Sequence, residues 1–458
     1  MKHSIWLIIV VIFNLNIAKA QQSPLDAYID EALNSNVALK QQELSYAKSL
    51  AALEEAKAYF LPTLSFDSRF TLAHGGRTID IPLGDLMNPV YDNLDLINSI
   101  NRDAIPGYPD LPGYPRLENE EIKFVRNTDQ ETRFRVAVPI YNAAILNNQK
   151  IKKGMVAAES ISVDIYRREL EKEVKIGYYN YLKATEAAKV FENAKKLVDE
   201  NLRTTQALYD NHQITIDRVY AAEAQVKEVE QQLAIADKDE KVAQAYFNFL
   251  LNADFDRPIT TIEEEALPIN ALSLESARNK AIQNRQELDQ LNKFIDVSSQ
   301  NIQLNRGNNL PEISFAADYG FQGSSYNFNR DSDFMMGSIA MKWNIFDRSN
   351  KYKVQQAQIE KSILEQRKIE TSQQIGLQVV NSFYDLEAAL KSIELATKEV
   401  ESTRKAYKLV FTKYQRSLAN LVELTESRTH KTNAEHKLVI ARFDYLTKLA
   451  EFESNLGY

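Results

Sequence analysis

Four segments of about ten residues alternate between apolar and polar positions, and this alternation restricts the possible folds more than any other feature. The segments cover about 62–72, 132–141, 311–321 and 335–346. In the first segment Leu64, Phe66, Phe70 and Leu72 occupy the even positions, and most of the odd positions are polar. Alternation of this kind predicts strands with one apolar and one polar face.

A single strand of this type is typical of a soluble β-sandwich, but four strands set in a long helical sequence do not make a sandwich of their own. Strands of about ten residues with an apolar outer face suit the wall of an outer-membrane β-barrel. Tyr141, Trp343 and Phe346 lie at strand ends, where such barrels carry aromatic girdles. Four strands cannot close around a lumen, and lipid does not tolerate open sheet edges. We therefore expect several chains to share one barrel.

The chain is a tandem duplication, because it aligns with itself at two fixed offsets. At an offset of 249 residues, FLPTLSF at 60–66 falls on NLPEISF at 309–315. At an offset of 205 residues, YYNY at 178–181 falls on FYDL at 383–386. The two offsets differ by 44, so the first repeat has about 44 extra residues between its anchored blocks. We predict a first repeat at 21–252, an equatorial linker at 253–272 and a second repeat at 273–458.

Long helices follow the second and fourth strands, at about 144–252 and 348–457. In the first of them apolar residues recur at spacings of three and four: Val174, Tyr178, Tyr181, Ala184, Ala188, Phe191, Ala194 and Val198. This spacing is typical of a coiled-coil seam. The stretches YDNHQIT at 209–215 and YQRSLAN at 414–420 interrupt the pattern. Each helical region is therefore predicted to be a long helical hairpin.

The connections between the strands differ between the two repeats. Residues 73–130 contain six of the twelve prolines and read as a long irregular loop, whereas the link at 322–333 is short and polar. Outer-membrane barrels carry their longer loops outside the cell. The other strand ends lead into the helices, which are therefore expected to extend into the periplasm.

Composition excludes several classes of function. The first 20 residues have a basic start, a short apolar run and Ala18-Lys19-Ala20, which predicts a cleaved signal peptide. The net charge of −8 disfavours a nucleic-acid binder. The chain has no cysteine, and its five histidines are too scattered for a metal or catalytic cluster. It has no phosphate-binding loop or zinc-protease motif. We predict no enzymatic activity and no cofactor.

Together the signal peptide, the two repeats of helix, strand, strand and hairpin, the LPxLSF-type strand start and the Tyr-initiated turns resemble the TolC-like outer membrane efflux proteins. The resemblance covers essentially the whole mature chain. It implies a homotrimer whose twelve strands form one barrel in the outer membrane, continued by an α-helical periplasmic tunnel. It also implies docking to an inner-membrane transporter through a periplasmic adaptor. The chain departs from the family in two ways: its turns lack the Gly that often follows the Tyr, and it lacks a lipid-modified N-terminal Cys.

The sequence thus predicts a mainly α-helical protein with a β-barrel portion, acting as a passive exit duct of a tripartite efflux or type I secretion system. The alternative is a periplasmic coiled-coil adaptor or scaffold without a pore, which has no need for four strands with a lipid-compatible face. The resemblance assigns adaptor contact to the two hairpin tips: Asn211, His212, Gln213, Ser417, Leu418 and Ala419. The candidate periplasmic gate consists of residues that carry opposite charges at equivalent positions of the two repeats: Asp199, Glu200, Arg404 and Lys405.

Overall fold

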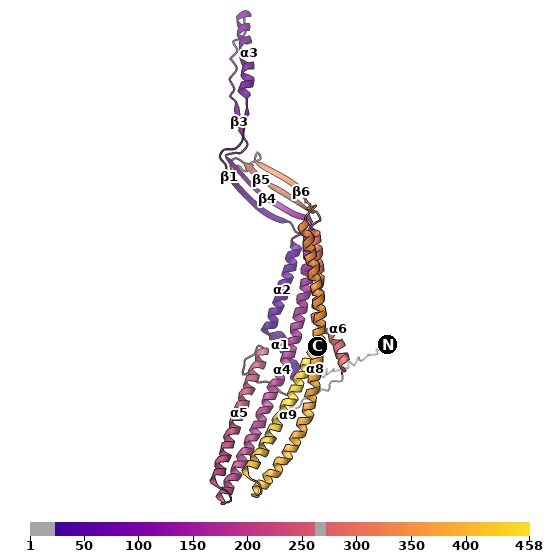
Figure 1. Cartoon of the computed structure of the whole chain (residues 1–458). Coiled ribbons are helices and arrows are strands. Elements are labelled where there is room, and N and C mark those ends of the chain that lie inside the picture. The colour runs from indigo at the N-terminus through magenta and orange to yellow at the C-terminus, as the bar shows by residue number, and fades with distance from the viewer. Residues whose placement is uncertain (1–22, 262–271) are drawn as a thin grey trace, which may run out of the picture. The chain divides into compact units, whose positions relative to one another are not determined.

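The computed structural model describes residues 23–261 and 272–458, and the chain divides into two compact units. One unit contains the long helices, and the other contains residues Glu55–Asn147 and Leu304–Lys351 with the strands (Figure 1). The predicted signal peptide at 1–20 and part of the linker at 253–272 lie outside the described residues.

The helices repeat with the same lengths in both halves of the chain. α4 and α8 have 68 residues each, α5 and α9 have 35 each, and α2 and α7 have 22 each. Their bounds, with those of the short helices α1 and α6, are α1 Pro24–Ser35, α2 Val37–Ala58, α4 Ala143–Asp210, α5 Ile216–Leu250, α6 Leu274–Asn284, α7 Gln286–Gly307, α8 Arg348–Gln415 and α9 Leu421–Asn455. The bounds of α4 and α5 map onto those of α8 and α9 at the offset of 205 found in the sequence.

Apolar side chains from both repeats form the main core of the helical unit. Tyr28 of α1, Tyr178 of α4 and Phe247 of α5 contact one another, with ring centroids 5.1–6.1 Å apart. Tyr445 and Phe452 of α9 belong to the same buried cluster. Most of the predicted seam is buried, including Val174 and Val198, so the spacing of three and four does mark a packing face.

Both helical hairpins end in the same type of cap. The N–H of Gln213 donates to the carbonyl of Leu208 at 2.9 Å, and the N–H of Leu418 donates to that of Lys413 at 2.9 Å. The residues before them, His212 and Ser417, have φ values of 61° and 58°. These are Schellman caps with a left-handed residue, a position that favours glycine.

Four strands form one antiparallel sheet in the order β1-β4-β5-β6. Their bounds are β1 Thr63–Leu72, β4 Thr128–Tyr141, β5 Glu312–Gly323 and β6 Asp333–Lys342. Strands β4 and β5, which come from different repeats, pair along most of their length with one irregularity between Pro139 and Tyr141. The duplication is therefore joined through the centre of the sheet.

The segment 73–127 is more regular than the sequence analysis expected. It contains the strands β2 Thr78–Ile81 and β3 Glu120–Lys123, which pair with each other, and the helix α3 Leu83–Ala104. Pro89 lies inside α3, where it removes one backbone hydrogen bond and disfavours a helix by local propensity. The expectation of an irregular loop was wrong because tertiary contacts along α3 support a helix that its own sequence disfavours.

Candidate functional site

Most of the large apolar residues of the four strands lie on one face of the sheet. Phe66 pairs with Phe134, which pairs with Tyr319 of β5, and Phe315 pairs with Ile339 of β6. The rings of Phe66 and Phe134 lie 5.1 Å apart, yet both residues are more than half exposed. A continuous apolar face of this width with no covering element is compatible with lipid.

Ion pairs connect the strands on the opposite face. Arg135 of β4 donates two hydrogen bonds to Asp318 of β5, at 2.7 and 2.9 Å. Arg69 of β1 donates to Glu131 of β4 at 2.8 Å, and Arg133 lies within 4.0 Å of Glu131 and Asp318. With Asp67, which lies 3.8 Å from Arg133, three arginines face three carboxylates across three strands. The polar face thus carries a charge-balanced lattice suited to a water-filled lumen.

The two outer edges of this sheet have no partner among the described residues. β1 and β6 are the end strands in the order β1-β4-β5-β6. An exposed, unpaired strand edge leaves backbone N–H and C=O groups unsatisfied, which lipid does not allow. Three antiparallel pairings separate β1 from β6, so these two strands run antiparallel to each other.

The structure brings the two predicted tips together. The Ser417 hydroxyl lies 3.1 Å from the Gln213 side-chain oxygen, to which it donates a hydrogen bond. Next to it the side chain of Leu418 is 72 % exposed. Asn211 and His212 are also exposed, whereas Ala419 packs against the buried cluster of Tyr414 and Leu421. The six predicted residues therefore form one surface at the end of the helical unit.

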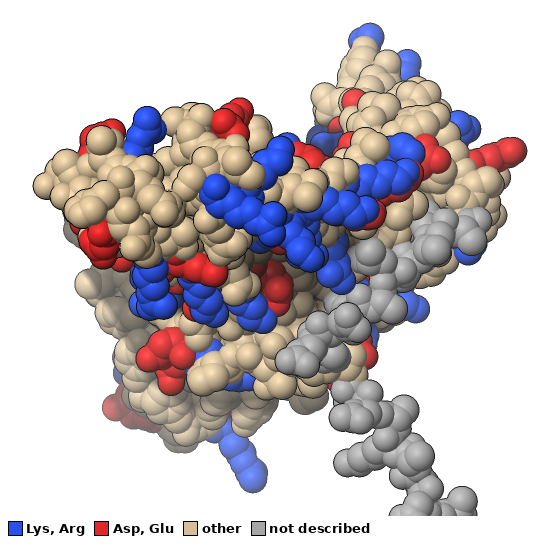
Figure 2. All heavy atoms as spheres, turned by 90° about the horizontal axis from the view of Figure 1, so that it is seen from below, with Lys and Arg blue, Asp and Glu red and all other residues tan. Residues whose placement is uncertain are grey.

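Three of the four gate candidates pair with residues of their own hairpins. Asp199 accepts a hydrogen bond from Lys195 at 3.1 Å, Arg404 donates to Glu435 at 2.7 Å, and Lys405 donates to Glu401 at 2.6 Å. In the part of the chain that the structure describes, neither Asp199 nor Glu200 forms an ion pair with Arg404 or Lys405. In Figure 2, Lys and Arg side chains lie beside Asp and Glu side chains on the visible face.

Two tyrosines join the hairpins beneath this charged surface. Tyr414 of α8 shares a hydrogen bond of 2.7 Å with Thr205 of α4, and Tyr407 donates to Asn201 at 3.4 Å. Burial and the charge of Glu200 raise the pKa of Tyr407 to about 12. These contacts were not predicted from the sequence. The spacing of seven residues between Tyr407 and Tyr414 is the signal that indicates a shared helix face.

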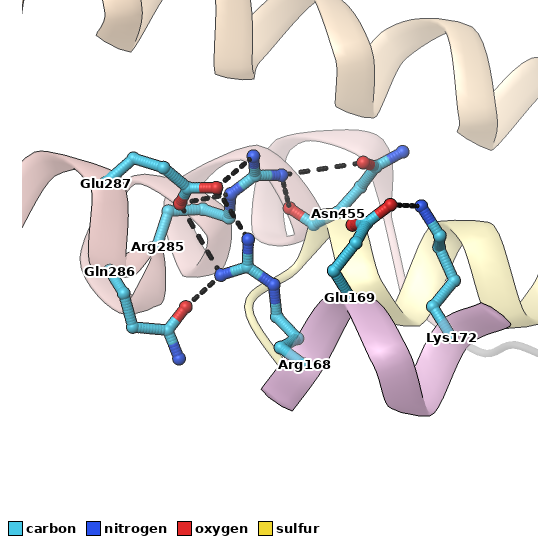
Figure 3. Close-up of polar contacts among 7 residues, drawn as sticks. All are labelled: Arg168, Glu169, Lys172, Arg285, Gln286, Glu287 and Asn455. Carbon is cyan, nitrogen blue, oxygen red and sulfur yellow. Dashed lines mark hydrogen bonds and ion pairs between the residues drawn. The ribbon is translucent and has the colours of Figure 1, made fainter. Parts of the chain in front are cut away.

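A buried polar cluster links α4, α7 and α9 (Figure 3). Glu287 accepts two hydrogen bonds from Arg285, at 2.8 and 2.9 Å, and two from Arg168, at 2.5 and 3.4 Å. Arg168 also donates to Gln286, and Arg285 donates to the backbone carbonyl of Asn455 at 3.4 Å. The cluster lies at the junction of α6 and α7 in the second repeat.

The equivalent junction of the first repeat uses different chemistry for the same contact. Asn36, which aligns with Arg285, donates to the carbonyl of Leu250 at 3.0 Å. Leu250 in turn aligns with Asn455, so each repeat ties its short helix to the end of its hairpin. Only the second repeat places two guanidinium groups on one carboxylate here. The donors Asn36 and Arg285 differ in residue type and in side-chain length. Aligning the two repeats therefore does not reveal this cluster.

Two further kinds of feature were searched for among the described residues. The structure has no group of three or more His, Asp or Glu side chains there that could hold a metal ion. Among the same residues, no helix is long and apolar enough to cross a membrane. The surfaces that remain are the two faces of the sheet, its open edges and the hairpin tips.

The chain was compared with protein-family models, curated proteins and solved structures. Residues 277–458 match the family model described as outer membrane efflux protein, which confirms the resemblance predicted from the sequence. The sequence matches no curated protein. Among solved structures, the chain is similar to the Campylobacter jejuni CmeC outer membrane channel, with 14 % identity and a TM-score of 0.73 over 95 % of this chain and 85 % of that one.

Two further structures share the fold over nearly their whole length. The Neisseria gonorrhoeae MtrE outer membrane channel has 16 % identity and a TM-score of 0.70, covering 95 % of this chain and 89 % of that one. The outer membrane protein VceC of Vibrio cholerae has 14 % identity and a TM-score of 0.71, covering 94 % and 96 %. The chain therefore shares the fold of these outer membrane proteins, with long helices and a four-stranded sheet.

Proposed function

We propose that this chain, with its outer membrane efflux protein match over residues 277–458, forms a homotrimeric exit duct that passively conducts substrates from an inner-membrane transporter to the outside. The observation that carries the proposal is the open four-stranded sheet. One face is apolar and uncovered, the other holds a charge-balanced lattice, and both edges are unpaired. A membrane wall needs all of these features and a soluble scaffold needs none.

Closure by three copies follows from the strand directions. Because β1 and β6 run antiparallel to each other, β6 of one copy can pair with β1 of the next and keep every pairing antiparallel. A ring of three copies then has twelve strands and no edge. The same face of every copy turns to lipid, and the lattice of arginines and carboxylates lines the lumen.

Cysteine cross-linking tests this closure, because the chain has no cysteine of its own. Ser65→Cys on β1 is combined with Cys at Met336, Ser338 or Ala340, which face the same side of β6. We expect one of these pairs to give covalent trimers in outer membranes. The control is Ser65→Cys with Ala316→Cys on β5, since two strand spacings of about 9–10 Å exceed the disulfide limit of about 7 Å. A soluble periplasmic monomer without cross-links would refute the duct and favour the scaffold.

The hairpin tips are the proposed contact with the periplasmic adaptor. Leu418 is an exposed apolar side chain on a rigid cap, as an interface anchor requires. Leu418→Glu is expected to abolish export and cross-linking to the adaptor while the trimer remains intact. Val242→Glu is the matched control, because Val242 is 60 % exposed and lies on the side of α5. Unchanged export by Leu418→Glu would contradict this contact.

The gate is proposed to use the opposite charges of the two hairpins in neighbouring copies. Asp199 and Glu200 of one copy would pair with Arg404 and Lys405 of the next and close the inner end. Such links must compete with partners inside each copy, such as Glu435 for Arg404, so each is weak and sensitive to salt. Competition of this kind suits a gate that a docking adaptor opens.

Charge reversal tests the gate directly. Asp199→Arg with Glu200→Lys should raise single-channel conductance, and adding Arg404→Asp with Lys405→Glu should restore the closed state. The reversal is measured at low salt, where screening is weakest. If the double variant conducts like the wild type, or the fourfold variant stays open, these residues do not form the gate.

A further inference from the structure

The helix α3 is an addition to the first repeat, because the second repeat has a short link in the same place. It lies in the segment that gives the first repeat about 44 extra residues. Its 22 residues correspond to a length of about 33 Å. The proposed barrel and tunnel do not require this helix. Its role is therefore inferred from the residues on its surface.

One face of α3 is covered by the following segment through polar contacts. Asn88 donates to the carbonyl of Leu117 at 2.8 Å and accepts from its N–H at 2.9 Å. The Asp95 carboxylate accepts from the N–H of Tyr114 at 3.2 Å. Two more contacts fasten the same face: Asp92 with Arg116, and Asp85 with Asn119. Residues 105–119 therefore lie along the polar side of the helix.

The opposite face of α3 is apolar and uncovered. Leu83, Leu86, Val90, Ile97 and Ile100 are between 40 % and 64 % exposed. Their spacings of three, four, seven and three residues follow the a and d positions of a heptad, with Asn93 at the position between Val90 and Ile97. This arrangement is the reverse of a helix packed on its own domain, where the apolar face is covered first. The stripe therefore has the residue spacing of a coiled-coil seam.

We propose that the α3 helices of the three copies pack together through this seam as a parallel three-helix coiled coil. The inference rests on the proposed trimer, which places three identical helices on one ring. A tether of this kind gives an effective concentration in the millimolar range, so weak seams associate. The copy number of three comes from the proposed trimer, and Asn93 is the one polar residue at the seam positions.

The links at the base of α3 are long enough for the three helices to meet. Twelve strands about 4.8 Å apart and tilted by about 35–45° enclose a barrel of roughly 12 Å radius. The five residues 73–77 span up to about 17 Å when extended. This link contains Gly75 and Gly76, with φ values of 79° and 118°. The helices can therefore reach a common axis over the outer mouth of the duct.

A packed three-helix seam has consequences for transport. Its interior is filled by leucine, valine and isoleucine side chains with Asn93, and it holds no water-filled bore. Substrates that leave the barrel must then pass between the three links, where Ala73 bonds to Asn127 at 2.9 Å and Arg77 lies over the Phe124 ring at 4.4 Å. The bundle adds a second connection between the copies outside the membrane.

Thiol cross-linking in outer membranes tests the seam. Val90→Cys, on the seam, is treated with a short bis-maleimide and should give cross-linked dimers within the trimer, since three thiols leave one unpaired. Asp92→Cys, two residues away on the covered face, should give at least tenfold less. Equal cross-linking at both positions, or none at Val90→Cys, would overturn the coiled coil.

Two further measurements keep the outcome unambiguous. The barrel trimer is monitored in the same samples by its heat-labile band and by the Ser65→Cys cross-link to β6. If the trimer forms and Val90→Cys does not react with its copies, the coiled coil is wrong and the duct stands. If no trimer forms, the proposed function fails and this inference with it. Ile97→Glu combined with Val90→Cys should abolish the cross-link and leave the barrel trimer unchanged.

Discussion

Replacing Glu287 with glutamine should destabilise the helical unit by about 3 kcal/mol. The side chains of Arg168 and Arg285 are only 5 % and 10 % exposed, and Glu287 is the one carboxylate that contacts both among the described residues. Breaking a buried ion pair from one side costs about 3–5 kcal/mol because the remaining charge stays in the interior. We take the lower value because a quarter of the Glu287 side chain is exposed and glutamine keeps one acceptor oxygen.

A neighbouring pair provides the matched control. Glu169 and Lys172 lie beside the cluster in Figure 3 and form an ion pair one turn apart on α4. Glu169 is about half exposed, so Glu169→Gln should change stability by less than about 1 kcal/mol. Urea unfolding of the detergent-solubilised protein, followed by far-UV circular dichroism, measures both variants. Equal midpoints for Glu287→Gln and Glu169→Gln would refute the reasoning.

The pH dependence gives an independent check on the same carboxylate. Burial raises the pKa of Glu287, but hydrogen bonds from Arg285 and the backbone and the charges of both arginines outweigh it, so the pKa lies below its ordinary value of 4.5. A lowered pKa means that the stabilisation is present above the unfolded-state value and is lost as pH falls through the folded-state value. The difference between wild type and Glu287→Gln should therefore shrink below about pH 4.5. A difference that grows on acidification would contradict the assignment.

The remaining predictions concern the sheet and the tips. Phe66→Arg on the apolar face should reduce the free energy of folding in lipid by about 2–4 kcal/mol. Ser65→Arg on the lumen face should reduce it by less than about 1 kcal/mol and change conductance. Folding titrations in lipid vesicles compare the two variants. The reverse order would show that the faces are exchanged. His212→Gly should stabilise its cap by about 1 kcal/mol, and Ser417→Gly by less because it loses the hydroxyl bond to the other tip. Slower amide exchange in the turns would support this, and equal protection by Asn211→Gly would argue against it.

The sequence by itself determined the elements that depend on local periodicity. Alternation placed Phe66 and its neighbours on one face of a strand, because side chains in a strand point to opposite sides in turn. The spacing of three and four residues predicted the seam that contains Val174. Self-alignment gave the offset of 205, and the helix bounds reproduce it because equivalent sequences fold with equivalent lengths. The two turns also followed from local breaks in these patterns.

The tertiary structure alone decided which charges pair and where a helix forms against its local propensity. Arg168 and Glu287 are 119 residues apart, and the Arg135–Asp318 pair is 183 residues apart. No local pattern selects such partners, because the sequence around an arginine does not indicate which distant carboxylate it contacts. The helix α3 contains Pro89 and forms because residues 105–119 bond along it. Local propensity is a weak term that contacts between distant segments override, so periodicity predicts the elements and packing decides their partners.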